Sequence, residues 1–302
     1  MALSTSTSSL SVCRATTRSV CTRTPVQARA AVVVKASDSS RPADASPSLL
    51  QRVGSLAAAA ALAVTISGSQ PAFATDLPET VYFGNGCFWG RQKEFVDTEK
   101  LMGRLPAQIS SVVGYAGGPK AGPDGKVCYY YSDPRTVYEK LGHAEVVKVD
   151  IAGSDKGDVT KEFRMFADTF FTQFQRTPGG MMRLDPQDAG PGYRNLVGLP
   201  GGVKSPLYQV LQDANVNGME LRAGTGNQFD SWGPLARPTE DDLMNVVWVY
   251  DSNALPFYQA EQYHQFHNGI GKAFSKDYRV DLKETLVAGG KITSTGCPEL
   301  PF

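Results

Sequence analysis

Hydrophobic and polar positions follow two different periods along most of this chain. Short runs of β-branched and aromatic residues predict strands at 80–83, 146–151, 195–199 and 246–250, and 109–114 is a further apolar run. Between them lie longer segments with apolar residues at helical spacing. Because strands and helices alternate, we expect an α+β fold, a mixed sheet with helices packed on it.

Three segments are predicted to be helical: the residues after Cys87, the segment with the phenylalanines at 163–174, and 256–267. The stripe that defines the second helix consists of Phe163, Phe166, Ala167, Phe170, Phe171 and Phe174. We expect this stripe to form core and the sequence Thr-Pro-Gly-Gly at 177–180 to end the helix. From about residue 275 the pattern is lost, which predicts an irregular C-terminal tail.

The first 74 residues have a different composition from the rest. Residues 1–37 are rich in Ser, Thr, Ala and Arg and contain no acid, which is typical of an organellar transit peptide. An apolar stretch at 56–66 and the sequence Ala-Phe-Ala at 72–74 then follow the pattern of a cleavable export signal. Two targeting signals in series resemble the N-terminal signals of plant and algal proteins that are imported into the chloroplast, including those sent on to the thylakoid lumen. The alternative is a disordered tail with a weak membrane anchor.

The charge balance separates the same two parts. Residues 1–74 hold seven of the 30 basic residues and two of the 30 acidic ones, which leaves 23 basic and 28 acidic residues and a net charge of −5 for the body. This body gives no electrostatic reason to expect nucleic-acid binding. We therefore expect a removed segment at 1–74 and one catalytic domain at 75–302, without stable membrane insertion.

The heptapeptide Gly-Asn-Gly-Cys-Phe-Trp-Gly at 84–90 is the first candidate for chemistry. A strand, a glycine turn and a helix start would place Cys87 on the first helical turn. Backbone N–H groups and the helix dipole at that position lower the pKa of a thiol, and the thiolate is the nucleophile. A cysteine among aromatics is more often core packing, so the rest of the chain has to decide.

Two further segments carry polar groups of catalytic type. Gly-His-Ala-Glu at 142–145 places Glu145 at the entry to an apolar strand, where burial would raise its pKa and keep it protonated as a general acid. Asp-Ala-Gly-Pro-Gly-Tyr-Arg at 188–194 offers Asp188 and Tyr193 on a glycine-rich loop. Taken singly, the first segment is explained better by a solvated strand end, and the second equally well by a surface loop with a packed tyrosine.

The spacing of the cysteines does not indicate a disulfide framework. Cys13 and Cys21 belong to the N-terminal segment, and Cys87, Cys128 and Cys297 remain in the body without zinc-site spacing. His264 and His267 with Glu261 could be read as metal ligands, but no matching cluster completes such a site, and we expect them to pack. We expect neither a metal nor another cofactor.

The motifs together resemble the A-type peptide methionine sulfoxide reductases, the enzymes specific for the S epimer of methionine sulfoxide. The similarity rests on the sequences GCFWG at 86–90, VGYAGG at 113–118, GHAEVV at 142–147, DxGxxYR at 188–194 and FYxAExYHQ at 257–265. These matches occur in order along essentially the whole body. The resemblance implies a ferredoxin-like α/β sandwich core, a monomer, a thioredoxin-like reductant, and oxidised proteins and free methionine sulfoxide as substrates.

The resemblance also implies roles for individual residues. Cys87 matches the nucleophile, and Phe88 and Trp89 match the apolar pocket for the substrate's S-methyl group. Glu145 matches the acid that protonates the sulfoxide oxygen, Tyr193 a phenol that hydrogen-bonds it, and Asp188 an aspartate that orders the site. Cys297 in the tail is the expected resolving thiol, which condenses with the sulfenic acid left on Cys87.

Some positions depart from the family pattern and keep alternatives open. Our choice for a second phenol is Tyr129, with Tyr130, Tyr131 and Tyr138 as alternatives in a long loop. Cys128 in that loop is expected to be a bystander near the site rather than a relay thiol. Two other functions compete: a cysteine hydrolase with His143 as base, and a redox sensor that only forms a disulfide between Cys87 and Cys297.

Overall fold

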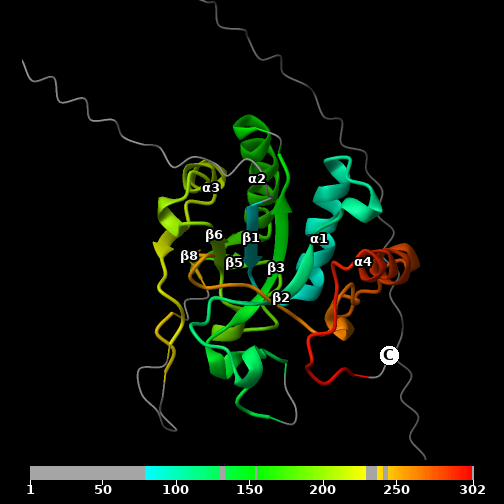
Figure 1. The fold of residues 1–302 in the computed structure, drawn as a ribbon. Coiled ribbons are helices and arrows are strands. Elements are labelled where there is room, and N and C mark those ends of the chain that lie inside the picture. Colours follow the sequence, from blue (N-terminus) through cyan, green and yellow to red (C-terminus); the bar gives the residue numbers. More distant parts are fainter. Residues whose placement is uncertain (1–78, 130–132, 154, 229–236, 241–243, 301–302) are drawn as a thin grey trace, which may run out of the picture. The chain divides into compact units, whose positions relative to one another are not determined.

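Seven strands form one mixed sheet in the computed structural model, which describes residues 79–129, 133–153, 155–228, 237–240 and 244–300 (Figure 1). Their order across the sheet is β7-β8-β6-β1-β3-β2-β9. The bounds are β1 Glu79–Gly84, β2 Val112–Ala116, β3 Ala144–Ile151, β6 Leu196–Leu199, β7 Glu220–Ala223, β8 Val246–Asp251 and β9 Tyr258–Gln259. A separate hairpin consists of β4, Phe174–Thr177, and β5, Gly180–Arg183.

The sheet is antiparallel on one side and parallel on the other. Strand β1 pairs antiparallel with both β3 and β6, and β2 pairs antiparallel with β3 and β9. Strand β8 is parallel to β6 and to β7. The α+β class and the mixed sheet are thus confirmed. Since β1 and β3 run in opposite directions with Phe83 opposite Val147, the end of β1 lies beside the start of β3.

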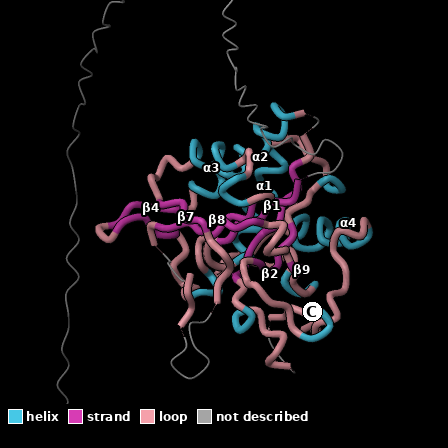
Figure 2. Tube along the Cα trace, turned by 60° about the vertical axis from the view of Figure 1, so that its left-hand side comes forward, coloured by secondary structure: helices cyan, strands magenta, loops and turns pink. Residues whose placement is uncertain are grey.

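Three helices lie on one face of this sheet: α1 Phe88–Leu101, α2 Lys156–Phe171 and α3 Tyr208–Ala214. A fourth helix, α4 Lys283–Ala288, follows near the C-terminus. Figures 1 and 2 show α1, α2 and α3 together on the same side of the strands. Asp155 begins α2, because its carboxylate accepts hydrogen bonds from the backbone N–H groups of Gly157 and Asp158.

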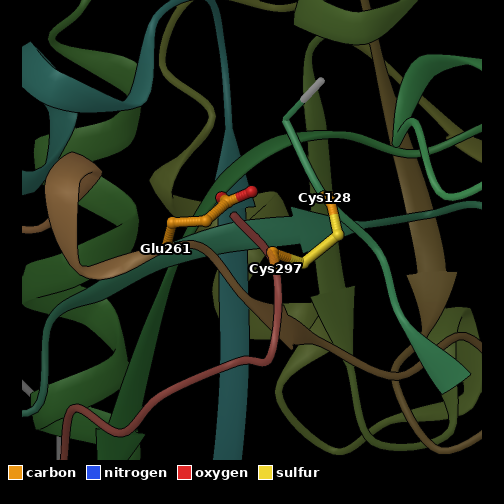
Figure 3. A group of neighbouring side chains, drawn as sticks. All are labelled: Cys128, Glu261 and Cys297. Atoms are coloured by element: carbon orange, nitrogen blue, oxygen red, sulfur yellow. A yellow bond between two sulfur atoms is a disulfide. The ribbon is translucent and has the colours of Figure 1, made fainter. Parts of the chain in front are cut away.

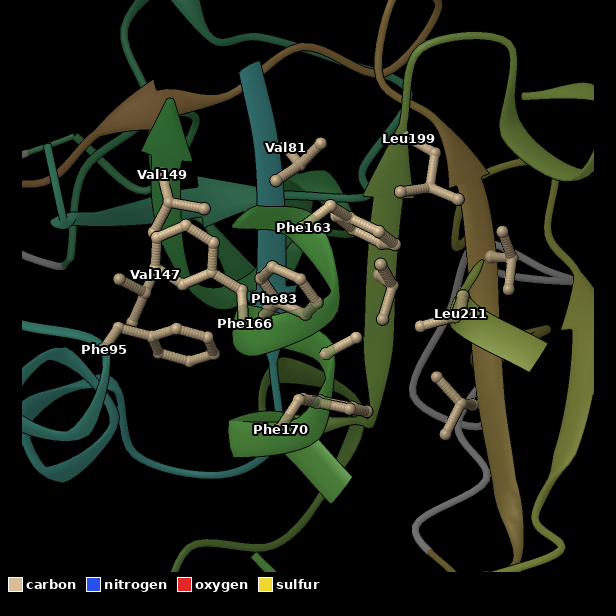
Figure 4. Close-up of a cluster of buried hydrophobic side chains, with 14 of the residues drawn as sticks. Val81, Phe83, Phe95, Val147, Val149, Phe163, Phe166, Phe170, Leu199 and Leu211 are labelled. Carbon is tan, nitrogen blue, oxygen red and sulfur yellow. The ribbon is translucent and has the colours of Figure 1, made fainter. Parts of the chain in front are cut away.

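The main core lies between the sheet and these helices (Figure 4). Alternate residues of β1 and β3, such as Phe83 and Val147, point toward α1 and α2. The Phe83 ring lies 5.1 Å from Phe95, 6.0 Å from Phe163 and 5.6 Å from Phe170, between ring centroids. Each such side chain contributes about 1.5–3 kcal/mol when fully buried. The predicted phenylalanine stripe is therefore core.

The other face of the sheet carries a second cluster. Tyr82, Val146, Trp248 and Tyr250 alternate with the residues of the first core. Loop residues such as Leu255 cover them, and the Tyr82 hydroxyl donates to the Leu255 carbonyl at 2.8 Å. Because β3 has this alternation, Glu145 lies on the same side of the strand as Val147, the side that faces α1.

The predicted helix at 256–267 is wrong. Strand β9 and a short turn of 3₁₀ helix at Gln262–His264 occupy this segment. Its polar groups bond to distant elements: the Gln265 side chain accepts from Val113 N and donates to Val113 O, and Phe266 N donates to the Gln92 side chain. Tertiary hydrogen bonds therefore replace the i→i−4 bonds that the spacing suggested.

Two other boundaries also differ from the prediction. Helix α2 ends at Phe171, and the sequence at 177–180 is the turn of the β4–β5 hairpin, in which Thr177 pairs with Gly180. The chain beyond residue 275 is not all irregular, because a π-helical segment at Asp277–Leu282 continues into α4. Tyr278, Leu282 and Leu286 bury their side chains there. The irregular tail begins only after α4.

The predicted targeting segment at 1–74 lies outside the described residues, which all belong to one compact unit, Thr65–Phe302. Among the helices of the described part, none has the length and apolar character needed to cross a membrane.

Candidate active site

Cys87 occupies the junction between β1 and α1. The turn before it contains Gly86 at φ +88°, where glycine is favoured, and Gly86 N donates to the Tyr193 carbonyl at 3.0 Å. Cys87 has extended backbone angles, φ −61° and ψ 126°, and α1 begins at the next residue. Its residue exposure is 7%, and its thiol is not part of a disulfide. The expected strand–turn–helix placement of this cysteine is thus present.

The side chain of Glu145, a residue of β3, lies against the first residue of α1. Its Oε2 accepts a hydrogen bond of 2.9 Å from the backbone N–H of Phe88, the residue that follows Cys87. The strands allow this close approach because Gly84 has no side chain: a Cβ at that position would lie 2.7 Å from the carbonyl oxygen of Glu145. The acid and the cysteine are therefore held in one buried pocket by the β1–β3 pair and the helix start.

The two groups are both held in their protonated forms. Burial raises the pKa of Glu145 well above its ordinary value, and the hydrogen bond from Phe88 opposes this only in part. Burial also raises the pKa of the Cys87 thiol, with further contributions from the carboxyl groups of Glu145 and Asp188. A hydrogen bond from the Trp89 backbone lowers it, but less strongly.

The expectation that the helix start lowers the pKa of Cys87 is therefore wrong for this structure. Removal of the sulfur from water and two neighbouring carboxyl groups outweigh the helix terminus. Cys87 rests as a thiol that hydrogen-bonds the Asp188 side chain. The expected direction for Glu145, a carboxyl whose pKa is raised by burial, agrees with the structure.

Three phenols surround the pocket. The hydroxyl of Tyr193 is linked by hydrogen bonds to those of Tyr129 and Tyr138, and Tyr138 also bonds to Glu145. Burial raises the pKa of Tyr193 to about 12, so this phenol keeps its proton at neutral pH. Tyr138 was an open alternative to Tyr129, and the structure brings both to the site. Tyr130 and Tyr131 lie outside the described residues.

Arg194 organises the loop that carries Asp188 and Tyr193. Its guanidinium is fully buried and donates to the carbonyls of Pro191, Gly117 and Gly142 and to the Tyr250 hydroxyl. Through these bonds it ties the 188–194 loop to the segments that follow β2 and precede β3. The Tyr193 carbonyl also accepts from Arg183 at 2.8 Å.

Aromatic rings form an apolar wall beside Cys87. The Phe88 ring lies 6.0 Å from Tyr115 and 5.4 Å from His264, and the Trp89 ring lies 3.9 Å from His267. Burial lowers the pKa of His264 to about 3, so its ring is neutral. Both histidines therefore contribute packing, and no metal-ligand group of the described residues contains either of them.

His143 cannot act on the thiol through its ring nitrogens, because both are occupied. Its Nδ1 accepts from Gly118 N at 3.1 Å, and its Nε2 bonds to the Lys120 carbonyl at 2.7 Å. Burial lowers its pKa to about 4. The arrangement that a cysteine hydrolase with this base requires is absent from the described site.

Cys297 forms a disulfide with Cys128, not with Cys87 (Figure 3). The Cα atoms are 5.7 Å apart, and the bond joins the loop before β3 to the C-terminal segment. Cys128, which we expected to be a bystander near the site, is thus bonded to Cys297. Glu261 lies with its carboxylate within 4.8 Å of both sulfur atoms. With the sulfurs bonded to each other, this group is not a thiolate ligand set for a metal.

Similarity to known proteins was sought at three levels. No family model matches the chain. It is 30% identical over 190 residues to a peptide methionine sulfoxide reductase MsrA from Agrobacterium fabrum, covering 62% of this chain and 67% of that protein. The chain belongs to the MsrA family.

Other proteins of that name match similarly. The identity is 29% over 187 residues for MsrA from Methanoculleus marisnigri, covering 87% of that protein, and 30% over 189 residues for MsrA from Methylococcus capsulatus, covering 64%. A solved structure, methionine sulfoxide reductase A of Corynebacterium diphtheriae, aligns at 21% identity over 64% of this chain and 74% of that one, with a TM-score of 0.34.

The site of this MsrA-family chain contains residues that sequence reasoning missed or misplaced. Tyr138 was one of several open choices for the second phenol, and the bridge between Cys128 and Val137 places it beside Tyr129. In the sequence, Glu261 was considered only as a possible metal ligand together with His264 and His267. Its two oxygens accept from Tyr129 N and the Tyr115 hydroxyl, each at 2.8 Å, which links the disulfide to the aromatic wall.

Proposed function

We propose that this chain reduces methionine-S-sulfoxide, free or in proteins, to methionine and so repairs oxidative damage. The observation that supports this best is the neutral Glu145 carboxyl, hydrogen-bonded to Phe88 N directly beside the free Cys87 thiol. A sulfoxide becomes a good electrophile only when its oxygen is protonated or hydrogen-bonded, because attack at sulfur moves charge onto that oxygen. Membership of the MsrA family supports the same reaction.

The first step consumes one thiol and one sulfoxide. Cys87 gives its proton to the Asp188 carboxylate with which it is hydrogen-bonded, and its sulfur attacks the sulfoxide. Glu145 protonates the oxygen while the phenols of Tyr193 and of Tyr129 or Tyr138 donate hydrogen bonds to it. The bond between the two sulfurs then breaks as the oxygen passes from the substrate's sulfur to that of Cys87, so that methionine leaves and Cys87 is left as a sulfenic acid. Sulfur of the substrate is reduced, and sulfur of Cys87 is oxidised.

The aromatic wall gives the substrate its orientation. Phe88 and Trp89 would hold the S-methyl group, with His264 and Tyr115 packed behind them. An apolar methyl on one side and proton donors on the other distinguish the two arrangements of groups at sulfur. This asymmetry favours a single epimer.

A second thiol then has to reduce the sulfenic acid. Cys297 would attack it, forming a disulfide with Cys87 and releasing water. A dithiol reductant of the thioredoxin type would restore the thiols by becoming a disulfide itself. A sensor that merely forms a disulfide would need no acid beside the nucleophile, whereas Glu145 is placed for protonation.

The location of the chain is also a proposal. The acid-free, Arg-containing residues 1–37 and the export-like stretch up to residue 74 support a chloroplast address, with the thylakoid lumen as the second step. Import of the full chain into isolated chloroplasts, followed by sedimentation of stroma and thylakoids and protease protection, would test it. A chain that is not imported into the chloroplast would refute this proposed location.

The reaction is tested with the full chain, dithiothreitol and each purified epimer of methionine sulfoxide. We expect loss of the S epimer with equivalent release of methionine, no loss of the R epimer, and no turnover by Cys87→Ser. The exposed Glu284 on α4 offers a matched control, since Glu284→Gln leaves the site intact. Full turnover by a folded Cys87→Ser variant, or none by the reduced wild-type chain, would refute the proposal.

A further inference from the structure

The Cys128–Cys297 disulfide leaves the nucleophile free. Of the three cysteines in the described part of the chain, Cys128 and Cys297 are oxidised to each other and Cys87 is a thiol. In the proposed function, the oxidation begins at Cys87. If the oxidation is passed on from Cys87 to the other two cysteines, Cys87 returns to a thiol and Cys128 and Cys297 are left joined. This is the arrangement in the structure.

We propose that Cys128 is a relay thiol, and that the Cys128–Cys297 pair is the disulfide that the external dithiol reduces. This rests on the proposed function. Once Cys87 and Cys297 are joined, the Cys128 thiolate attacks the sulfur of Cys297. The bond between Cys297 and Cys87 breaks, the bond between Cys297 and Cys128 forms, and Cys87 leaves as thiolate. This exchange involves no net oxidation and needs no further reactant.

The disulfide lies one layer of side chains away from the nucleophile. Tyr129, which follows Cys128, faces Tyr193, and Cys87 contributes to the high pKa of its phenol. Glu261, within 4.8 Å of both sulfurs, accepts the Tyr115 hydroxyl, and Tyr115 packs against Phe88. Cys297 has to cross this layer to reach Cys87.

The segment that carries Cys297 is suited to that movement. It follows α4 without helix or strand in residues 289–300. Its polar ties are few and partly exposed, including the bonds from Gln262 N and Tyr263 N to the Glu299 carboxylate and those between Gln259 and Thr293. Cys128 is fixed by comparison, because its backbone bonds to Thr136 and Tyr138.

The disulfide also has an approach from solvent that does not pass through the substrate site. A pocket of about 370 Å³ is lined by both cysteines and by charged side chains that include Lys126 and Arg135. A dithiol that enters there would meet Cys297, which is 8% exposed, before Cys128, which is 1% exposed, while the aromatic wall beside Cys87 stays in place. Lys126 lies close to Gly296, the neighbour of Cys297, and its positive charge favours a thiolate at that position.

Glu261 completes this second centre as the group that exchanges the proton. Figure 3 shows its side chain directed toward the disulfide, from a segment distant in sequence from both cysteines. Burial raises its pKa, which favours the protonated form of this carboxyl beside the disulfide. When the dithiol opens the disulfide, this proton goes to the departing thiolate, and the carboxylate later accepts it back when the thiol is needed as nucleophile.

The relay is tested by counting methionine released from fully reduced enzyme without reductant. Cys13 and Cys21 are replaced by Ser so that three of the chain's five cysteines remain. The relay regenerates Cys87 once, so we expect about two methionines per chain, and about one from Cys128→Ser or Cys297→Ser. One methionine from the chain with all three thiols would overturn the relay, whereas none from any variant would overturn the proposed function itself.

A second measurement needs no variant of the relay pair. After one equivalent of methionine sulfoxide, peptide mapping under non-reducing conditions should find Cys128 joined to Cys297. A stable Cys87–Cys297 peptide in its place would overturn the relay. This keeps the test decisive if Cys128→Ser does not fold.

The role of Glu261 is tested by Glu261→Gln, which keeps one acceptor oxygen, for Tyr129 N or for the Tyr115 hydroxyl, and replaces the other by an amide group that cannot accept. We expect about a tenfold or larger loss of steady-state turnover with dithiothreitol, at an unchanged yield of methionine in the absence of reductant. The loss should be greatest at the lower pH values, where the wild-type carboxyl holds its proton. Unchanged turnover, or an equal loss of yield and turnover, would overturn the assignment of Glu261.

Discussion

The replacement Glu145→Gln isolates the proton of the proposed acid. Glutamine has nearly the same volume, and its amide oxygen can accept the 2.9 Å bond from Phe88 N, so the start of α1 keeps its partner. What the variant lacks is the acidic proton. General acids contribute about 10²–10⁴-fold to the rate, which corresponds to about 2.7–5.5 kcal/mol. Because the phenols of Tyr193 and Tyr138 still face the oxygen, we expect the lower half of this range.

The assay is the rate of methionine formation in a single turnover, measured across pH with the S epimer. The wild-type rate should decline at alkaline pH, since the reaction requires the proton of Glu145. Burial raises the pKa of Glu145, so the decline should lie on the alkaline side of the ordinary range for a glutamate. In Glu145→Gln this decline should be absent.

A variant that keeps most of the wild-type single-turnover rate, or that retains the alkaline decline, would refute this reasoning. Glu284→Gln, on exposed α4, is the control for a change of charge alone and should behave as the wild type. Ultraviolet absorbance of the thiolate measures the pKa of Cys87 directly. This pKa should fall in Glu145→Gln, because the negative charge of Glu145 helps to raise the pKa of the thiol.

Four further predictions concern stability and the alternatives. Glu145→Gln should stabilise the fold at neutral pH, with a gain that disappears in acid. A carboxyl whose pKa is raised in the folded state favours folding below its unfolded pKa, and this contribution is lost as pH rises. Thermal denaturation of both proteins against pH would show or contradict this. Gly84→Ala should lower the melting temperature and the activity together, since its Cβ would lie 2.7 Å from the Glu145 carbonyl; an unchanged melting temperature would refute the contact. Arg194→Ala removes the donor for three buried carbonyls and should cost about 3–5 kcal/mol in urea unfolding, a loss that a surface role would not produce. His143→Gln should leave methionine sulfoxide reduction largely intact, whereas complete loss would revive a role for this ring in the reaction.

Local pattern was sufficient for most of the sheet and for the first two helices. The runs around Val81 and Val149 alternate between two buried faces, and the phenylalanines of α2 recur at helical spacing, so each element shows its period within its own residues. The segment at 256–267 shows why this fails elsewhere. Its apolar residues have helical spacing, but Gln265 and Phe266 find their partners in β2 and α1, which no local pattern reveals.

The sequence by itself determined the members of the site, because Cys87, Glu145 and Tyr193 lie in distinctive local motifs. Only the tertiary structure decided their protonation and their partners. The pKa of Cys87 depends on burial and on carboxyl groups from β3 and from the loop at 188–194, and these outweigh the helix start that the motif indicates. Cys128 and Cys297 are separated by 169 residues, and spacing does not choose between the possible pairs of three cysteines. Pairing and pKa are properties of distance and of exclusion from water, and both arise only when distant segments pack together.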